Sequence, residues 1–463
     1  MKLALAFAAL VAAPMTSIAA PGQVGNIIYM ERCKNGCTLK KGVDDSRTLT
    51  SSIVSGSGTD FPMAEFMSST GQTGAAADAE WNALVTCVKE VYSPYNVVIT
   101  DQKPTTGSYQ AVVVAGLDED IGVSGAAGIA NVHCQPLDNG VSFVFANGVG
   151  GSAASRLEFL CGAVAQETAH NYGLSHEYKF TDGRSACTDP MTYRSDCGGQ
   201  QFFRNEQAYC GGFVQENCNC GGTIQNSHVA LLGVFGPGTP ITAPPTVTYT
   251  GPAAGSEVAT GTAVIAIAKA QRGIFRMELW LNGYKWNEVK GVAWGRMGQP
   301  EASYSIPIPA GVPDGVIDIV VKAKDDIDVT TATAPVTVMK GAPCATADSC
   351  LAGQKCEAGK CFWEPPSGNF GDACTYPQFC TNGFCEGTAE VKICTQECVV
   401  GVADACPDES YECIQSSSQK GVCFPKGLGE EGNCLGCSSA STGAPPVLLA
   451  AFGLAFVLRR RRR

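Results

Sequence analysis

The chain has 463 residues, 24 cysteines and a formal net charge of -11. This length is too great for one hydrophobic core, and about three domains are expected. The acidic balance argues against nucleic acid as a partner, because proteins that bind nucleic acid present basic surfaces. So many cysteines are typical of an exported protein whose thiols pair in an oxidising compartment.

The first residues predict a signal peptide. Lys2 precedes an apolar run over 3–13, and the small residues at 17–20 supply a cleavage site that we expect after Ala19. The apolar run is too short to span a bilayer. We therefore expect residues 1–19 to be removed on export.

The segment 20–237 alternates strand and helix patterns. Apolar residues at helical spacing predict helices over 76–92 and about 154–172, the second ended by Gly173. Strand-forming runs occur at 26–30, 96–100, 110–115, 128–133 and 141–147. This order predicts an α/β layered domain.

The end of the second predicted helix carries a cluster with metal-binding spacing. Gln166 and His170 are one turn apart and face the same way, so that both can contact one ion. Glu167 is placed to act as general base on the attacking water. Gly173 can adopt the left-handed conformation that turns the chain back, which lets His176 approach the same ion.

This stretch resembles the metzincin signature H-E-x-x-H-x-x-G-x-x-H at every defined position except the first, where Gln166 replaces histidine. The segment Asp189-Pro190-Met191-Thr192-Tyr193 resembles the family's Met-turn, with Met191 placed 15 residues beyond His176.

The resemblance implies a zincin-like fold over 20–237 with a bound Zn²⁺. The implied metal ligands are His170, His176 and Gln166. The implied catalytic residues are Glu167 as general base and Tyr193 as the group that stabilises the oxyanion.

Gln166 leaves three interpretations open, because a carboxamide oxygen is a weaker zinc ligand than an imidazole. Gln166 ligates weakly in an active or sluggish peptidase, or another group such as His133 completes the site, or the domain has lost catalysis and binds peptides. Retention of Glu167 and Tyr193 favours metal and catalysis.

The other cysteines of this segment are expected to form disulfides. A bridge between Cys161 and Cys187 would brace the helix and the Met-turn, and for Cys134 a disulfide is favoured over a thiolate ligand. His228 is expected to have a packing or surface role.

Residues 238–245 read as a Gly- and Pro-containing linker, after which strand patterns dominate. The predicted strands of the segment 246–340 lie at 246–249, 263–268, 276–281, 303–308, 316–322 and 334–338. This pattern predicts an all-β sandwich and resembles bacterial Ig-like modules of surface proteins.

The segment 341–425 contains 12 cysteines and few apolar runs, so it is predicted to form small disulfide-rich modules. Cysteine pairs two residues apart, which a zinc ribbon needs, do not occur in it.

The segment 426–463 reads as a tail with a Gly-Cys-Ser site at Cys437, an apolar run over 447–458 and five terminal arginines. The apolar run is shorter than the ~20 residues of a comfortable membrane span. The tail resembles the MYXO-CTERM class of sorting signals. That resemblance implies lipidation at Cys437 and attachment of the protein at the cell surface or outer membrane.

Together these features predict a cell-surface, zinc-dependent endopeptidase-like protein that hydrolyses a peptide or protein substrate with the help of the metal. The alternative is a catalytically inactive relative that serves as an adhesion or protein-binding module for a surface protein ligand. Zinc content distinguishes the two.

Overall fold

The computed structural model describes residues 25–194, 197–291, 301–400, 405–418 and 421–426. They form two compact units, the first reaching Leu351 and including Lys355–Phe362, the second made of Ala352–Gln354 and the residues from Trp363 onward. The predicted signal peptide and the tail with Cys437 lie outside the described residues. Within the described residues, no helix is long and apolar enough to cross a membrane.

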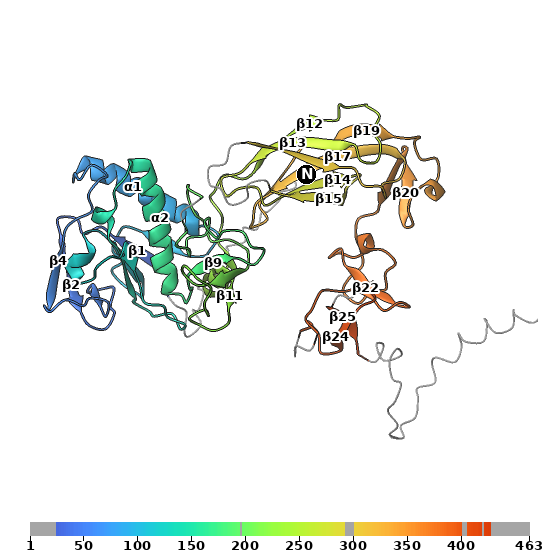
Figure 1. Ribbon diagram of the computed structural model, residues 1–463. Helices are drawn as coiled ribbons and strands as arrows, with labels where there is room; N and C mark the ends of the chain where they lie inside the picture. The colour runs from blue at the N-terminus through green and yellow to red at the C-terminus, as the bar shows by residue number, and fades with distance from the viewer. Residues whose placement is uncertain (1–24, 195–196, 292–300, 401–404, 419–420, 427–463) are drawn as a thin grey trace, which may run out of the picture. The chain divides into compact units, whose positions relative to one another are not determined.

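The N-terminal domain is built on a five-stranded sheet (Figure 1). The strand order is β5 (Val98–Thr100), β1 (Ile27–Glu31), β6 (Gln110–Val114), β8 (Val141–Val144) and β7 (Gly128–Ile129). The first four run parallel, and β7 lies antiparallel at one edge. Every residue of β6 and β8 is buried, which explains their continuous apolar runs.

Helices α1 (Ala75–Tyr92) and α2 (Ala153–His170) pack side by side on one face of this sheet (Figure 1). Their apolar faces share a core with the residues of β1 and β6 that point to that side, such as Ile28 and Val112. A disulfide between Cys87 and Cys161 links the two helices. Ser152 caps the start of α2, where its hydroxyl accepts a hydrogen bond from the backbone N of Ser155 at 3.2 Å.

The other face of the sheet packs against a small sheet of β2 (Cys37–Lys41), β3 (Thr50–Ser51) and β4 (Asp60–Met63). After α2 the chain forms a third sheet, and helix α3 completes the domain. These elements are β9 (Glu177–Phe180), β10 (Ala208–Cys210), β11 (Ile224–Gln225) and α3 (Ser227–Phe235). Two short 3₁₀ helices, η1 (Asp118–Ile121) and η2 (Ala146–Gly148), lie before α2 in the chain.

The following domain is an all-β sandwich of two antiparallel sheets. One sheet contains β12 (Thr246–Gly251), β13 (Ala263–Lys269) and β16 (Ala302–Pro307). The other contains β14 (Arg276–Leu281), β15 (Tyr284–Lys290), β17 (Gly315–Lys324), β18 (Thr330–Ala332) and β19 (Val336–Lys340). Burial alternates along β17, as expected for a strand with one face in a core.

The disulfide-rich region consists of short hairpins and turns. Its elements are η3 (Ala347–Ser349), β20 (Gln354–Glu357), β21 (Lys360–Trp363), η4 (Pro377–Phe379), β22 (Cys385–Gly387), β23 (Lys392–Cys394), β24 (Tyr411–Gln415) and β25 (Gly421–Pro425). Disulfides contribute to the buried contacts here, for example Cys380–Cys394 within a small cluster that includes Cys385.

The structure corrects several details of the sequence predictions, and it adds elements that were not predicted, namely β2, β3, β4, β9, β10, β11, β18 and α3. Cys161 pairs with Cys87 and Cys187 with Cys197, so the predicted Cys161–Cys187 bridge is wrong. Strand β15 was not predicted. The strand predicted over 128–133 is only Gly128–Ile129.

Candidate metal centre at the end of helix α2

The last turns of α2 place Gln166, Glu167 and His170 in the buried part of the domain. The helix ends because Gly173 adopts φ +90°, and its backbone N donates to the carbonyl of His170 at 3.0 Å. A Cβ at position 173 would lie 3.3 Å from the His133 carbonyl oxygen and 3.4 Å from Cys220 Sγ. The chain therefore reverses tightly at this glycine.

The reversal brings His176 to His170. Their Nε2 atoms lie 3.1 Å apart, and the rings meet edge to face. Nδ1 of His170 lies 2.7 Å from the Leu174 carbonyl oxygen, which fixes the tautomer with the proton on Nδ1 and the lone pair on Nε2. Two imidazole nitrogens on a tetrahedral zinc ion lie roughly 3.3 Å apart. The spacing of this pair fits two ligands of one zinc ion.

Burial keeps both imidazoles in the neutral form that binds metals. It lowers the pKa of His170, against a smaller opposite effect of the Leu174 carbonyl. Burial, followed by the charge of His170, lowers the pKa of His176 to about 3.

The side-chain amide of Gln166 donates its hydrogen bonds to the segment that resembles a Met-turn. Nε2 donates to the carbonyl oxygens of Pro190 at 2.7 Å and Thr192 at 3.2 Å. The side-chain oxygen is then the atom that remains for a metal. Gln166 lines the same cleft as the two histidines.

The Glu167 carboxyl group is buried against the edge strand β7. A Cβ on Gly128 would lie 2.7 Å from Glu167 Oε1, so only glycine leaves room for the carboxylate there. Burial raises the pKa of Glu167 to about 8. A cation bound between the histidines would lower this pKa again and favour the basic form.

The segment 189–193, which resembles a Met-turn, contacts Gln166 and is fixed by Asp189. Met191 is fully buried, and its backbone N donates to Asp189 Oδ1 at 2.9 Å. Tyr193 is half-exposed, and its ring centroid lies 4.1 Å from that of His176. On its other side Tyr193 stacks on Phe213 at 5.3 Å.

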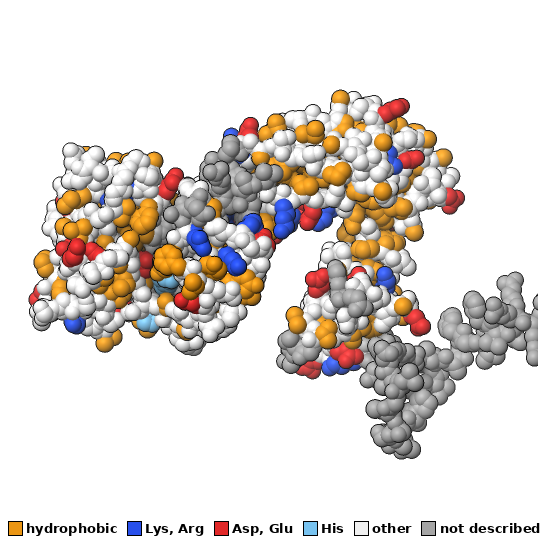
Figure 2. Space-filling view, viewed as in Figure 1, with side chains coloured by type: hydrophobic (Ala, Val, Ile, Leu, Met, Phe, Trp, Pro, Cys, Tyr) orange, Lys and Arg blue, Asp and Glu red, His pale blue; other side chains and the backbone are white. Residues whose placement is uncertain are grey.

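A cleft of about 790 Å³ is lined by the candidate site residues, namely Gln166, Glu167, His170, His176 and Tyr193. One wall is the segment 125–130, which contains β7, and the others are α2 and the segment after Met191. Figure 2 views a face of the N-terminal domain on which histidine side chains reach the surface among hydrophobic ones. Phe159 and Phe213, which the sequence analysis did not single out, line the cleft and are exposed. Nothing in their local sequence marks them.

The two alternative metal ligands considered from the sequence differ in what the structure shows of them. His133 is not among the described residues that line the cleft, its backbone N donates to the His170 carbonyl at 3.2 Å, and its Nε2 is buried without a hydrogen-bond partner. Cys134 forms a disulfide with Cys220 and offers no thiolate. The other groups of three cysteines close enough to hold a metal are likewise joined in disulfides. His228 is buried and contacts the Tyr95 hydroxyl, which confirms its packing role.

No family model and no curated protein matches the chain. Solved structures with a likeness include fibronectin(III)-like modules of Clostridium thermocellum CbhA, with 20% identity over 21% of this chain and 94% of that one, and a TM-score of 0.14. OgpA from Akkermansia muciniphila is 10% identical over 70% of this chain and 95% of its own, with a TM-score of 0.20. A Jonesia denitrificans lytic polysaccharide monooxygenase is 16% identical over 35% of this chain and 98% of its own, at 0.15. These TM-scores are too low to assign a fold or an activity to this chain.

Proposed function

We propose that the N-terminal domain is a zinc-dependent endopeptidase-like domain of the metzincin type. The observation that carries this proposal is the approach of two neutral histidines, Nε2 to Nε2 at 3.1 Å, beside a buried glutamate. The reversal at Gly173 and the contacts of Gln166 with the segment that resembles a Met-turn support the same assignment.

His170, His176 and the side-chain oxygen of Gln166 would hold the zinc ion. Zinc bound here would supply a Lewis acid for the scissile carbonyl and for the attacking water. Glu167 accepts the proton of that water and passes it to the leaving amine. The Tyr193 hydroxyl donates a hydrogen bond to the oxyanion that develops on the carbonyl.

The edge strand β7 supplies the surface for the peptide substrate. β7 pairs with β8 on one side, and the segment 125–130 around it forms a wall of the cleft. An extended peptide can add to such an edge through backbone hydrogen bonds. Its scissile bond would then lie next to Glu167, whose carboxylate contacts Gly128.

A second candidate function, an inactive peptide-binding module at the cell surface, is favoured by the contacts of Gln166. Its amide hydrogens are satisfied by Pro190 and Thr192 without any metal, so that the fold does not need an ion to keep this side chain in place. A neutral histidine at this position would have a single N–H and could not donate to both carbonyls.

Metal analysis of the full exported, oxidised chain tests the proposal. We expect bound zinc in the unaltered protein and an affinity roughly 10- to 100-fold or more higher in Gln166→His, by analogy with changes around other metal sites. Gln207→His, which adds a histidine at an exposed position, is the matched control. Zinc in Gln166→His alone would favour the inactive binding module, and zinc in neither protein would contradict a metzincin-type site.

The catalytic role is tested by Glu167→Gln in the same chain. This variant should keep its zinc and lose peptide cleavage, since it removes the proton acceptor and preserves the shape of the side chain. Cleavage at an unchanged rate would contradict the assignment.

We further propose that the C-terminal tail attaches the protein to the cell surface through Cys437. The 11 disulfides use all the cysteines of the described residues, so that none of these is left as a partner for Cys437. Such extensive disulfide bonding is typical of an extracellular protein. Mass spectrometry of the mature C-terminus would show a lipid on Cys437, or rule it out.

A further inference from the structure

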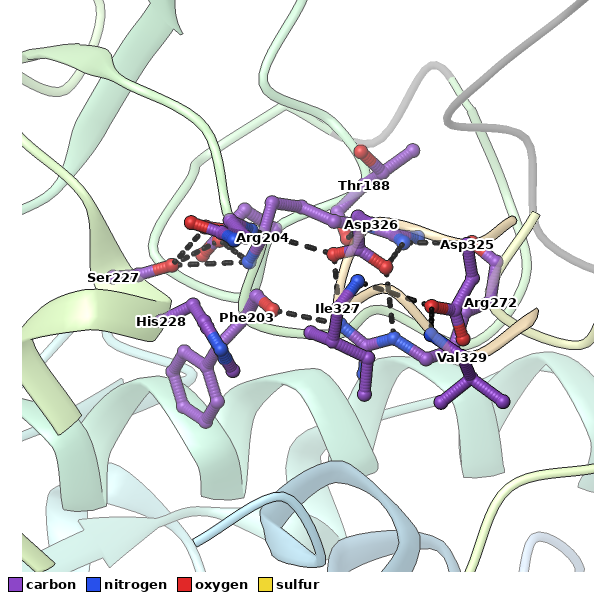
Figure 3. Close-up of polar contacts among 12 residues, drawn as sticks. Thr188, Phe203, Arg204, Ser227, His228, Arg272, Asp325, Asp326, Ile327 and Val329 are labelled. Carbon is purple, nitrogen blue, oxygen red and sulfur yellow. Dashed lines mark hydrogen bonds and ion pairs between the residues drawn. The ribbon is translucent and has the colours of Figure 1, made fainter. Parts of the chain in front are cut away.

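A buried cluster of charges joins the sandwich to the N-terminal domain within the first compact unit (Figure 3). Arg204 belongs to the N-terminal domain, and Arg272 and Asp326 belong to loops of the sandwich, after β13 and after β17. The side chains of Arg204 and Asp326 are 0% exposed and that of Arg272 is 1% exposed. Charges this deeply buried are retained only where each is paired.

Asp326 is the centre of this cluster. Its two oxygens accept hydrogen bonds from Nε and Nη2 of Arg272, both at 2.8 Å, in a two-pronged pair. It also lies 3.4 Å from Nη1 of Arg204 and accepts from the backbone N of Asn205 at 3.3 Å. Burial alone would raise the pKa of Asp326, but the charges of Arg272 and Arg204 outweigh it and lower the pKa.

Arg204 extends these contacts into the Met-turn region (Figure 3). Its Nε donates to the Thr188 carbonyl at 3.2 Å, and its backbone N donates to Asp189 Oδ2 at 2.7 Å. The hydroxyl of Ser227 donates to the same Asp189 oxygen at 2.5 Å. Asp189 in turn accepts from the backbone N of Met191.

The Met-turn then contacts the candidate metal ligand Gln166, whose Nε2 donates to the carbonyls of Pro190 and Thr192. A series of buried hydrogen bonds, linked through the backbone at Arg204 and between Pro190 and Thr192, thus runs from Asp326 in the sandwich to the side chain of Gln166.

We propose that Asp326 of the sandwich is a positioning residue for the Met-turn and for Gln166. The sandwich is then a part of the candidate site and not a spacer. The effect of Asp326 on metal binding rests on the proposed function. The effect of Asp326 on the order of the Met-turn does not depend on the proposed function.

The segment between the two domains supports this view. The backbone N atoms of Gly238, Ile241 and Ala243 donate to Pro94 O, Ser93 Oγ and Gln271 Oε1, at 2.8, 3.1 and 2.9 Å. Gln271 also reaches Glu90 of α1, its Nε2 donating to Oε2 at 2.7 Å. The predicted linker is therefore fixed to both domains.

Hydrogen exchange measured by mass spectrometry on the full exported chain tests the proposal. In Asp326→Asn, which removes the charge and keeps the shape, we expect the amides of 188–193 to exchange at least about tenfold faster, while those of α1 are unchanged. The matched control is Asp318→Asn, since Asp318 pairs with Lys360 and Thr337 within the first unit, far from Arg204 along the chain. If Asp326→Asn does not fold, Arg272→Lys, which keeps the charge and loses the two-pronged pair, is measured in the same way.

Exchange at 188–193 that matches the unaltered protein, in a folded variant, would overturn the proposal. Exchange that rises equally in α1 would also overturn it, because it would show a general loss of stability. Titration with Co²⁺ separates this inference from the proposed function: the Co²⁺ absorption spectrum should change in Asp326→Asn and not in Asp318→Asn. If the unaltered chain binds no Co²⁺, the metal site fails while the exchange experiment still decides the role of Asp326.

Discussion

In the proposed metal site, Gln166 takes the place of a histidine and offers a weaker ligand atom. Both hydrogens of its amide are engaged by the carbonyls of Pro190 and Thr192. The orientation of the side chain is therefore set by the Met-turn. Its oxygen faces any bound ion as a neutral carbonyl, which is a poorer zinc ligand than imidazole.

A buried histidine away from the metal centre gives a prediction for pH dependence. Burial lowers the pKa of His228 to about 4. Since the unfolded chain has its histidine pKa near 6.5, the stability linked to His228 is complete above about pH 6.5 and is lost as the pH falls through about 4. The loss amounts to roughly 3 kcal/mol.

Denaturant unfolding of metal-free protein between pH 7 and 4 checks this expectation. The stability advantage of the unaltered chain over His228→Gln should shrink across that interval, because glutamine does not titrate. Tyr95→Phe removes the hydroxyl 2.9 Å from His228 Nδ1 and keeps the titrating ring, so its pH dependence should persist. Parallel curves for the unaltered protein and His228→Gln would contradict the prediction.

The candidate site residues differ in how far the sequence identifies them. Gln166, Glu167, His170 and His176 fall in one short stretch, and helical spacing alone brings the first three together. Arg204 and Asp326 are separated by 122 residues, and no local pattern marks them as partners. Their pairing depends on the packing of two domains, which sequence spacing does not encode.

At the scale of elements, the end of α2 depends on the reversal at Gly173. Alanine there would have to adopt φ near +90°, which costs about 1–2 kcal/mol, and its Cβ would press on the His133 carbonyl and Cys220 Sγ. We expect Gly173→Ala to separate His176 from His170 and to weaken zinc or Co²⁺ binding at least about tenfold. Metal titration of the folded variant measures this.

Gly183 provides the control, since it has the same φ of +90° and no atom within 4 Å of an added Cβ. Gly183→Ala should show the backbone strain in its melting temperature and leave metal affinity unchanged. An equal loss of affinity in both variants would mean that the tight packing at Gly173 does not position His176.

The two long helices were predicted better than the short strands and the short helix α3, for a physical reason. Trp81, Leu84 and Val88 repeat at helical spacing, and α1 forms within one residue of its predicted start. Strand β15, by contrast, is partly or fully exposed along its whole length, and its alternation of apolar and polar residues breaks at Glu288, between Trp286 and Val289. At β7 the predicted strand stops early, and His133 contacts the end of α2 instead of a neighbouring strand.

At the scale of the whole molecule, the sequence suggested separate domains joined by a linker. The described part of the chain groups the N-terminal domain and the sandwich in one compact unit, in which each has a hydrophobic core of its own. Arg272 packs its guanidinium over Phe202, 4.7 Å from the ring centroid, and donates to the Phe203 carbonyl at 2.9 Å. The sandwich therefore covers the apolar ring of Phe202 and provides a hydrogen-bond donor for the Phe203 carbonyl.

A comparison of two chains that differ in the sandwich measures this coupling. The fragment 21–236 loses the contacts of Arg204 and Phe203 to the sandwich, whereas 21–362 keeps them. With about 1 kcal/mol for each of about three lost buried hydrogen bonds, and a shift of roughly 2–4 °C per kcal/mol in a domain of this size, we expect the fragment to melt roughly 6–12 °C lower.

The fragment should also bind a hydrophobic dye through the uncovered Phe202 and Phe203. Unfolding is monitored by near-ultraviolet circular dichroism of the aromatic residues of the N-terminal domain. Equal melting temperatures of the two chains would show that the sandwich is only a spacer. A lower value would explain why metal affinity has to be measured on the longer chain, where the Met-turn is held from both sides.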